Sequence, residues 1–131
     1  MLRFLILSGS ILIVSTAHAE LRINQDGKGQ VISISGLYDS PEGCHTSQSN
    51  GMIVKREFKE DALTLSGIVL EASDGTRAFM NVDVETDKLN MAAKGNLLRG
   101  LQLLTFVGRK VSVTAYACGA AGRTFFLDAI K

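Results

Sequence analysis

The amino-acid sequence predicts an α+β fold in which one helix serves a mostly antiparallel β-sheet. Three observations predict it. Apolar and polar side chains alternate through residues 62–85 on either side of Asp74-Gly75, a dipeptide typical of tight hairpins. Residues 88–106 then carry leucines at helical spacing, and residues 110–117 return to a period of two. One helix between strands, in a chain without an internal repeat, is typical of an α+β domain.

The first nineteen residues have the pattern of a secretory signal peptide. Arg3 precedes an apolar run that ends at Val14, and Ala17 and Ala19 form an A-x-A cleavage pattern. The run is too short to span a bilayer comfortably, and no later segment approaches the roughly 20 apolar residues of a transmembrane helix. We predict cleavage after Ala19 and export to the periplasm or the exterior, with an uncleaved anchor as the alternative.

The predicted mature chain, residues 20–131, has the length of one domain and no transmembrane segment. The full sequence carries 14 basic and 13 acidic residues, so the loss of Arg3 leaves a net charge of zero. A neutral chain lacks the basic surface that binds a polyanion, so we expect no nucleic-acid partner.

Both cysteines, Cys44 and Cys118, follow the predicted signal peptide. An even pair in an exported domain most simply forms a disulfide. Closing a loop of this length stabilises a protein by roughly 4 kcal/mol in the chain-entropy model. We therefore predict a Cys44–Cys118 disulfide.

The chain begins, after the signal peptide, with a predicted hairpin. Residues 21–24 and 31–37 alternate in polarity, and Asp26-Gly27 lies in the segment between them. This dipeptide favours a tight turn between two strands.

Residues 38–51 are predicted to be a loop, because they hold the only proline of the chain among glycine, serine and asparagine residues. A loop of this length is unusual in a compact domain, and Cys44 would pin it. Residues 52–58 are predicted to form a short strand.

The hairpin around Asp74-Gly75 is expected to have one buried and one solvated face. On its returning strand Met80 and Val82 point one way, and Phe79 points the other way. Gly67, within the preceding strand, marks a bulge or bend of the kind that small barrels need at their corners.

The helix predicted over residues 88–106 has candidate N-caps and an apolar stripe. The N-cap candidates are Thr86, Asp87 and Asn90. The stripe consists of Leu97, Leu98, Leu101 and Leu104. Gly108 is expected to end the helix, and a glycine-rich turn then separates the strand at 110–117 from a closing strand.

The order of elements over residues 62–131 resembles that of an OB-fold. That fold is a small five-stranded barrel with a helix between its third and fourth strands. The resemblance is carried by LTLSGIVLEASDGTRAFMNVDVE and by LLRGLQLLTFVGRKVSVTAYACGAAGRTFFLDAI. It implies a small antiparallel barrel, and one further strand must come from residues 31–37 or 52–58.

Within this architecture the chain is also similar to the pentameric B subunits of heat-labile-type bacterial enterotoxins. Those subunits are exported, have about this size, and carry one disulfide between an N-terminal segment and the strand after the long helix. Cys44 and Cys118 fit that placement. This resemblance implies a ring-forming homo-oligomer that binds glycans.

Residues with catalytic or metal-binding chemistry are few. His45 is the one histidine of the predicted mature chain, and no nucleophile motif frames a serine near it. Asp83, Glu85 and Asp87 lack the ligand spacing of a calcium loop. We therefore expect no catalytic residue, no metal and no cofactor.

The predicted partner surface combines aromatic and basic side chains. Its aromatic members, on strand faces opposite the inferred core, are Phe79, Tyr116 and Phe126. Its basic members, which flank the last two strands, are Arg109, Lys110 and Arg123. The sequence thus predicts a non-catalytic exported binding module with a protein or glycan partner, and a toxin-type B subunit is the alternative.

Overall fold

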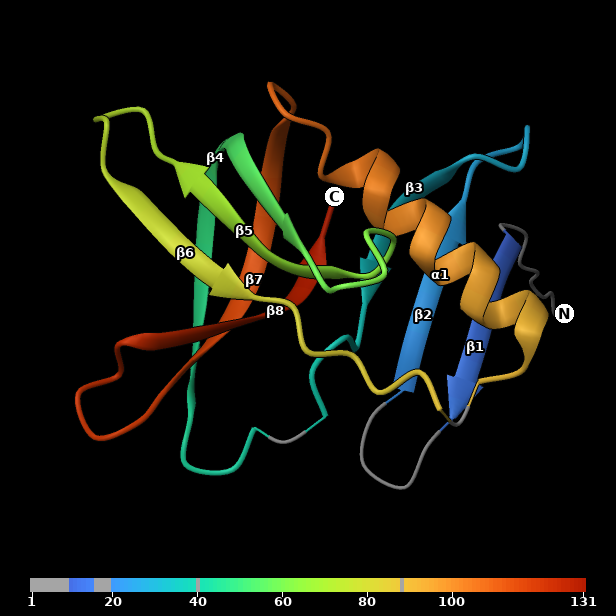
Figure 1. Ribbon diagram of the computed structural model, residues 1–131, viewed down its shortest axis with the longest axis horizontal. Helices are drawn as coiled ribbons and strands as arrows, with labels where there is room; N and C mark the ends of the chain where they lie inside the picture. The colour runs from blue at the N-terminus through green and yellow to red at the C-terminus, as the bar shows by residue number, and fades with distance from the viewer. Residues whose placement is uncertain (1–9, 16–19, 40, 88) are drawn as a thin grey trace, which may run out of the picture.

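The computed structural model describes residues 10–15, 20–39, 41–87 and 89–131 (Figure 1). Within these ranges the chain forms eight strands and one helix. They are β1 (Ser10–Ser15), β2 (Glu20–Gln25), β3 (Val31–Ser35), β4 (His45–Phe58), β5 (Leu65–Glu71), β6 (Arg77–Asn81), α1 (Met91–Leu104), β7 (Lys110–Cys118) and β8 (Thr124–Ile130).

Strands β4 to β8 close into a barrel, as predicted. Their order is β8-β6-β5-β4-β7, and pairing between β7 and β8 completes the ring. The prediction of an antiparallel barrel is wrong at one pair, because β6 and β8 are parallel where Asn81 lies opposite Phe126. A closed ring with an odd number of strands cannot alternate in direction throughout, so one parallel pair is required.

The strand that completes the barrel is β4, which contains the predicted strand 52–58 and extends well before it. The loop prediction over residues 38–51 is therefore wrong from His45 onward. Residues 45–52 pair with β7, and residues 52–58 pair with β5. The serine and asparagine residues of this segment favour turns locally, but pairing with β7 along its length holds it extended.

The predicted N-terminal hairpin is confirmed by the pairing of β2 with β3. The Asp26 carboxylate closes the turn, because its Oδ1 accepts hydrogen bonds from the backbone N–H groups of Lys28 and Gln30, at 2.8 and 2.9 Å. The hairpin joins the barrel where Ile34 lies opposite Ile130.

The predicted signal peptide, residues 1–19, lies largely outside the described residues. Its one described segment is β1, which pairs with β2 in antiparallel register. Among the described residues, no helix is long and apolar enough to cross a membrane.

Helix α1 is shorter than the predicted 88–106. Asn90 is the N-cap, with its Oδ1 accepting a hydrogen bond from the Ala93 N–H at 2.8 Å. The helix ends at Thr105, whose N–H and hydroxyl both donate to the Leu101 carbonyl oxygen. Gly108, at φ +95°, therefore shapes the following turn and does not end the helix.

Helix α1 lies over the N-terminal hairpin, beside the barrel, and its closest contacts are with β3 (Figure 1). Leu97, Leu101 and Leu104 are buried, whereas Leu98 is half-buried. At Gly100, an added Cβ would lie 3.1 Å from Ile34 and Val31, so the absence of a side chain allows this close approach. The core is continuous from this interface into the barrel.

The hairpin at Asp74-Gly75 is confirmed, with β5 and β6 as its strands and Gly75 at φ +89°. Met80 and Val82 are buried and Phe79 is exposed, as the alternation predicted. Gly67 lies beside a shift in the β4–β5 register, and the ring of Phe79 covers it. The two strands cover less of the chain than the alternating pattern over residues 62–85. β5 begins at Leu65, and β6 ends at Asn81.

Candidate binding surface

The segment between β3 and β4 is tied to the outside of the barrel at several points. The backbone N–H of Leu37 donates to the Asp128 carbonyl oxygen at 3.0 Å, and the N–H of Tyr38 donates to Asp128 Oδ1 at 3.2 Å. The predicted Cys44–Cys118 disulfide is present and joins the end of this segment to the end of β7. Tyr38 is thereby held over the last two strands.

Three aromatic side chains meet there, and we call them the aromatic cluster: Tyr38, Tyr116 and Phe126. The rings of Tyr38 and Phe126 are stacked, with centroids 4.3 Å apart and planes 7° apart. The Tyr116 ring lies 6.0 Å from that of Tyr38 and is tilted by 47°. Tyr116 and Phe126 are opposite each other in the β7–β8 register. All three side chains are half-buried, so part of each ring faces solvent.

The carboxyl group of Asp128 lies beside this cluster, two residues after Phe126 on β8. Burial raises its pKa, and the hydrogen bond from the Tyr38 N–H opposes that shift. Burial also raises the pKa of Tyr116, with a smaller contribution from the charge of Asp128. The pKa of Tyr38 is raised by burial and then by the charges of Asp83 and Asp39. Both phenols therefore stay protonated at neutral pH and can donate hydrogen bonds.

The predicted aromatic surface is assembled in part. Tyr116 of β7 lies opposite Phe126 of β8, and on the other side of β8 Asn81 of β6 lies opposite the same residue. Phe79, 41% exposed, lies two residues before Asn81 on β6 and so shares its face. Sequence reasoning missed Tyr38, whose place follows from the pinned segment and not from any strand pattern.

The predicted basic residues do not gather with the aromatic cluster as one group. Arg109 and Lys110 lie at the start of β7, whereas Arg123 lies beside the turn that follows its end. Nine strand residues separate the two positions, which is about 30 Å along an extended strand.

Other candidate chemistry remains dispersed. His45, exposed at the start of β4, lies opposite Ala117. A hollow of about 290 Å³ is lined mainly by acidic residues, namely Asp39, Asp83, Glu85 and Asp87, together with Lys59, Val84 and Thr86. Within the described part of the chain, no group of three or more His, Cys, Asp or Glu side chains is arranged to hold a metal ion.

Comparison with known proteins leaves the site as the guide to function. No protein-family model matches the chain, and no curated protein matches it.

Proposed function

We propose that this protein is a non-catalytic binding module built on an OB-type barrel, with the aromatic cluster as its contact surface. Support for the OB type comes from the strand connections. The long first barrel strand, β4, pairs with both β5 and β7, and α1 lies between the third and fourth barrel strands. The last strand, β8, pairs in parallel with β6 and in antiparallel with β7.

The observation that carries the binding function is the assembly of the aromatic cluster outside the barrel core. Its members come from three separate segments, and a disulfide and two hydrogen bonds donated to Asp128 hold one of these segments in place. Tyrosine side chains offer a large rigid contact area at low entropy cost, together with a hydroxyl group. A pinned, half-exposed cluster of this kind is pre-organised for a ligand.

Export is part of the same proposal. The pattern of residues 1–19 supports cleavage by a signal peptidase, and the Cys44–Cys118 disulfide supports an oxidising compartment.

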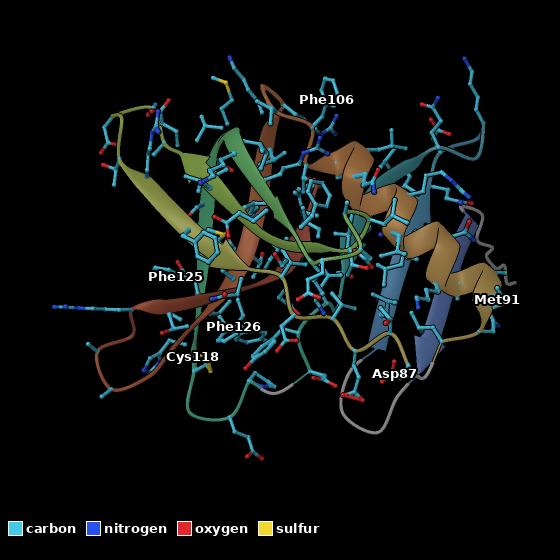
Figure 2. The ribbon with its side chains drawn as sticks, viewed as in Figure 1. Asp87, Met91, Phe106, Cys118, Phe125 and Phe126 are labelled. Carbon is cyan, nitrogen blue, oxygen red and sulfur yellow. A yellow bond between two sulfur atoms is a disulfide. The ribbon has the colours of Figure 1, made fainter. Side chains whose placement is uncertain are left out.

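The experiment compares the purified protein with two variants on an array of glycans and on a peptide library. Tyr38→Ala removes the cluster member that comes from the loop. Phe106→Ala is the control, because Phe106 is 65% exposed and lies at the opposite end of the barrel from Phe126 and Cys118 (Figure 2). We expect Tyr38→Ala to weaken binding about tenfold or more and Phe106→Ala to leave it unchanged. Ligands bound equally by Tyr38→Ala, or returned chemically altered, would contradict the proposal.

A second function, a ring-forming glycan-binding subunit of the enterotoxin type, has one specific observation in its favour. The end of α1 and the turn after it expose large apolar side chains, namely Leu103, Phe106 and Val107, each at least 50% exposed. Contiguous apolar side chains of this kind are typical of subunit contacts. A monomeric native mass would exclude this function and leave the first proposal intact.

A further inference from the structure

A polar groove lies on the outside of the barrel, between β3 and the paired strands β4 and β7. It encloses about 520 Å³. The residues that line it with side-chain hydrogen-bonding groups are Ser33, Ser35, Gln48, Ser49, Asn50, Ser112, Thr114 and Lys131. A second hollow of about 600 Å³ shares Asn50, Ser112 and Lys131 with it and continues toward Glu71.

The groove is rich in groups that both donate and accept hydrogen bonds. Serine and threonine hydroxyls do both, and the amides of asparagine and glutamine offer an acceptor oxygen beside a donor NH₂. Among the described residues that line the groove, Lys131 is the only charged one. A ligand matched to this lining is neutral and carries many groups that donate and accept.

The groove leads directly to the aromatic cluster. In the β4–β7 register Asn50 lies opposite Ser112, Gln48 opposite Thr114, and Thr46 opposite Tyr116. Residues two apart on a strand share a face, so these pairs form a continuous row. The Ser112 hydroxyl donates to Asn50 Oδ1 at 2.7 Å, which confirms that both side chains lie on this face. From Ser112 to Tyr116 the row extends over about 13 Å of strand.

The backbone of β7 beneath this row is paired on both edges, with β4 on one side and β8 on the other. Among the described residues, 45–51 of β4 pair with β7 alone, because the pairing of β4 with β5 begins at Met52. The other edge of this segment is therefore the place where an extended peptide could add to the sheet. A ligand that lies over the face of the row contacts its side chains instead, and those side chains suit a chain of hydroxyl groups.

We propose that the groove and the aromatic cluster together form one extended site for a neutral linear oligosaccharide. The sugar hydroxyls bond to the Asn50–Ser112 and Gln48–Thr114 pairs, and a sugar ring lies against the aromatic cluster. This inference rests on the proposed binding function and names its ligand class.

The test is calorimetric titration of the full protein with three neutral series: β-1,4-glucans, α-1,4-glucans and N-acetylated chitin oligomers, each from disaccharide to hexasaccharide. We expect one series to bind with an affinity that rises with length. Gln48→Ala and Asn50→Ala should each weaken binding about tenfold, the effect of losing one or two good hydrogen bonds. Asn96→Ala is the matched control, because Asn96 lies on α1, away from the groove. The Gln48 side chain is exposed, so we expect Gln48→Ala to unfold at the same temperature as wild type. That result would show that the variant keeps its fold.

The outcomes separate this inference from the proposed function. No binding by any series at millimolar concentration, or binding that Gln48→Ala and Asn50→Ala leave unchanged, would overturn the oligosaccharide site. Binding of a peptide or of single-stranded oligothymidine in the groove would overturn it as well. If no oligosaccharide series bound but a library peptide did, and Tyr38→Ala lost that peptide, the oligosaccharide inference would fail while the proposed function stood.

Discussion

Tyr38 and Phe126 stack face to face with their ring centroids 4.3 Å apart, although they come from opposite halves of the chain. Two features produce this contact. The backbone N–H of Tyr38 donates to Asp128, two residues beyond Phe126, and the Cys44–Cys118 disulfide closes the same segment onto β7. The contact surface of the proposed binding module therefore depends on links that lie outside the barrel core.

The disulfide should be a major source of stability. Its cysteines are 74 residues apart, and the chain-entropy model gives about 4 kcal/mol for a loop of this size. We expect Cys118→Ser to lower the free energy of unfolding by several kcal/mol, measured by urea denaturation. Non-reducing mass spectrometry should show the oxidised chain two hydrogens lighter than the reduced chain. Free thiols at both positions would contradict this prediction.

The helix stripe can be tested with two leucines on different faces of α1. Leu101 is 2% exposed, so Leu101→Ala should cost roughly 2 to 5 kcal/mol of unfolding free energy. Leu103 is 53% exposed, so Leu103→Ala should cost under about 1 kcal/mol. Equal and large losses at both positions would mean that the helix is buried all round. A lower oligomer mass in Leu103→Ala, with a folded monomer, would favour the ring-forming subunit.

Two glycines in the barrel should differ in their tolerance of a side chain. At Gly51 an added Cβ would lie 2.5 Å from the Glu71 carbonyl oxygen, and backbone cannot easily move, so Gly51→Ala should cost about 1 to 3 kcal/mol. At Gly67 the nearest atom is the ring end of Phe79, also 2.5 Å away, and that exposed ring can turn aside. Gly67→Ala should therefore cost less, and adding Phe79→Ala should remove the clash. Thermal unfolding of the single and double variants measures both effects, and a larger loss at Gly67 would refute the prediction.

Asp128 should make the protein less stable as pH rises. Burial raises the pKa of this carboxyl in the folded state, so the folded chain holds its proton more tightly than the unfolded chain does. Its contribution is most favourable below the unfolded pKa of about 4 and is lost as pH rises through the folded pKa. We expect Asp128→Asn to gain stability relative to wild type at neutral pH and to lose that advantage in acid. Denaturation curves at several pH values measure this difference, and a constant difference would exclude the mechanism.

Asp61 should act in the opposite direction. Hydrogen bonds from the Thr64 hydroxyl and from the backbone N–H groups of Thr64 and Leu63 lower its pKa to about 2. Its contribution is present above the unfolded pKa of about 4 and is lost as pH falls toward 2. Asp61→Ala should therefore remove part of the stability that the wild type loses as pH falls from about 4 toward 2. Acid titration of the circular dichroism signal measures this loss. A variant with the acid transition of the wild type would contradict this role.

Local signals in the sequence determined several elements. The N-cap at Asn90 and the hairpin at Asp74-Gly75 were predictable because each depends only on neighbouring residues. The Cys44–Cys118 pairing was predictable because the chain offers no other pair.

Only the tertiary structure decided the rest. Residues 45–51 form a strand because β7 pairs with them, and the parallel β6–β8 contact follows from closing a ring of five strands. Arg109 and Arg123 lie at opposite ends of the β7–β8 pair, although both flank its strands. Tyr38 joins the aromatic cluster because Asp128 and the disulfide hold its loop over β8. Each of these outcomes depends on residues distant in the chain, whose approach is set by packing and strand pairing and not by local propensity.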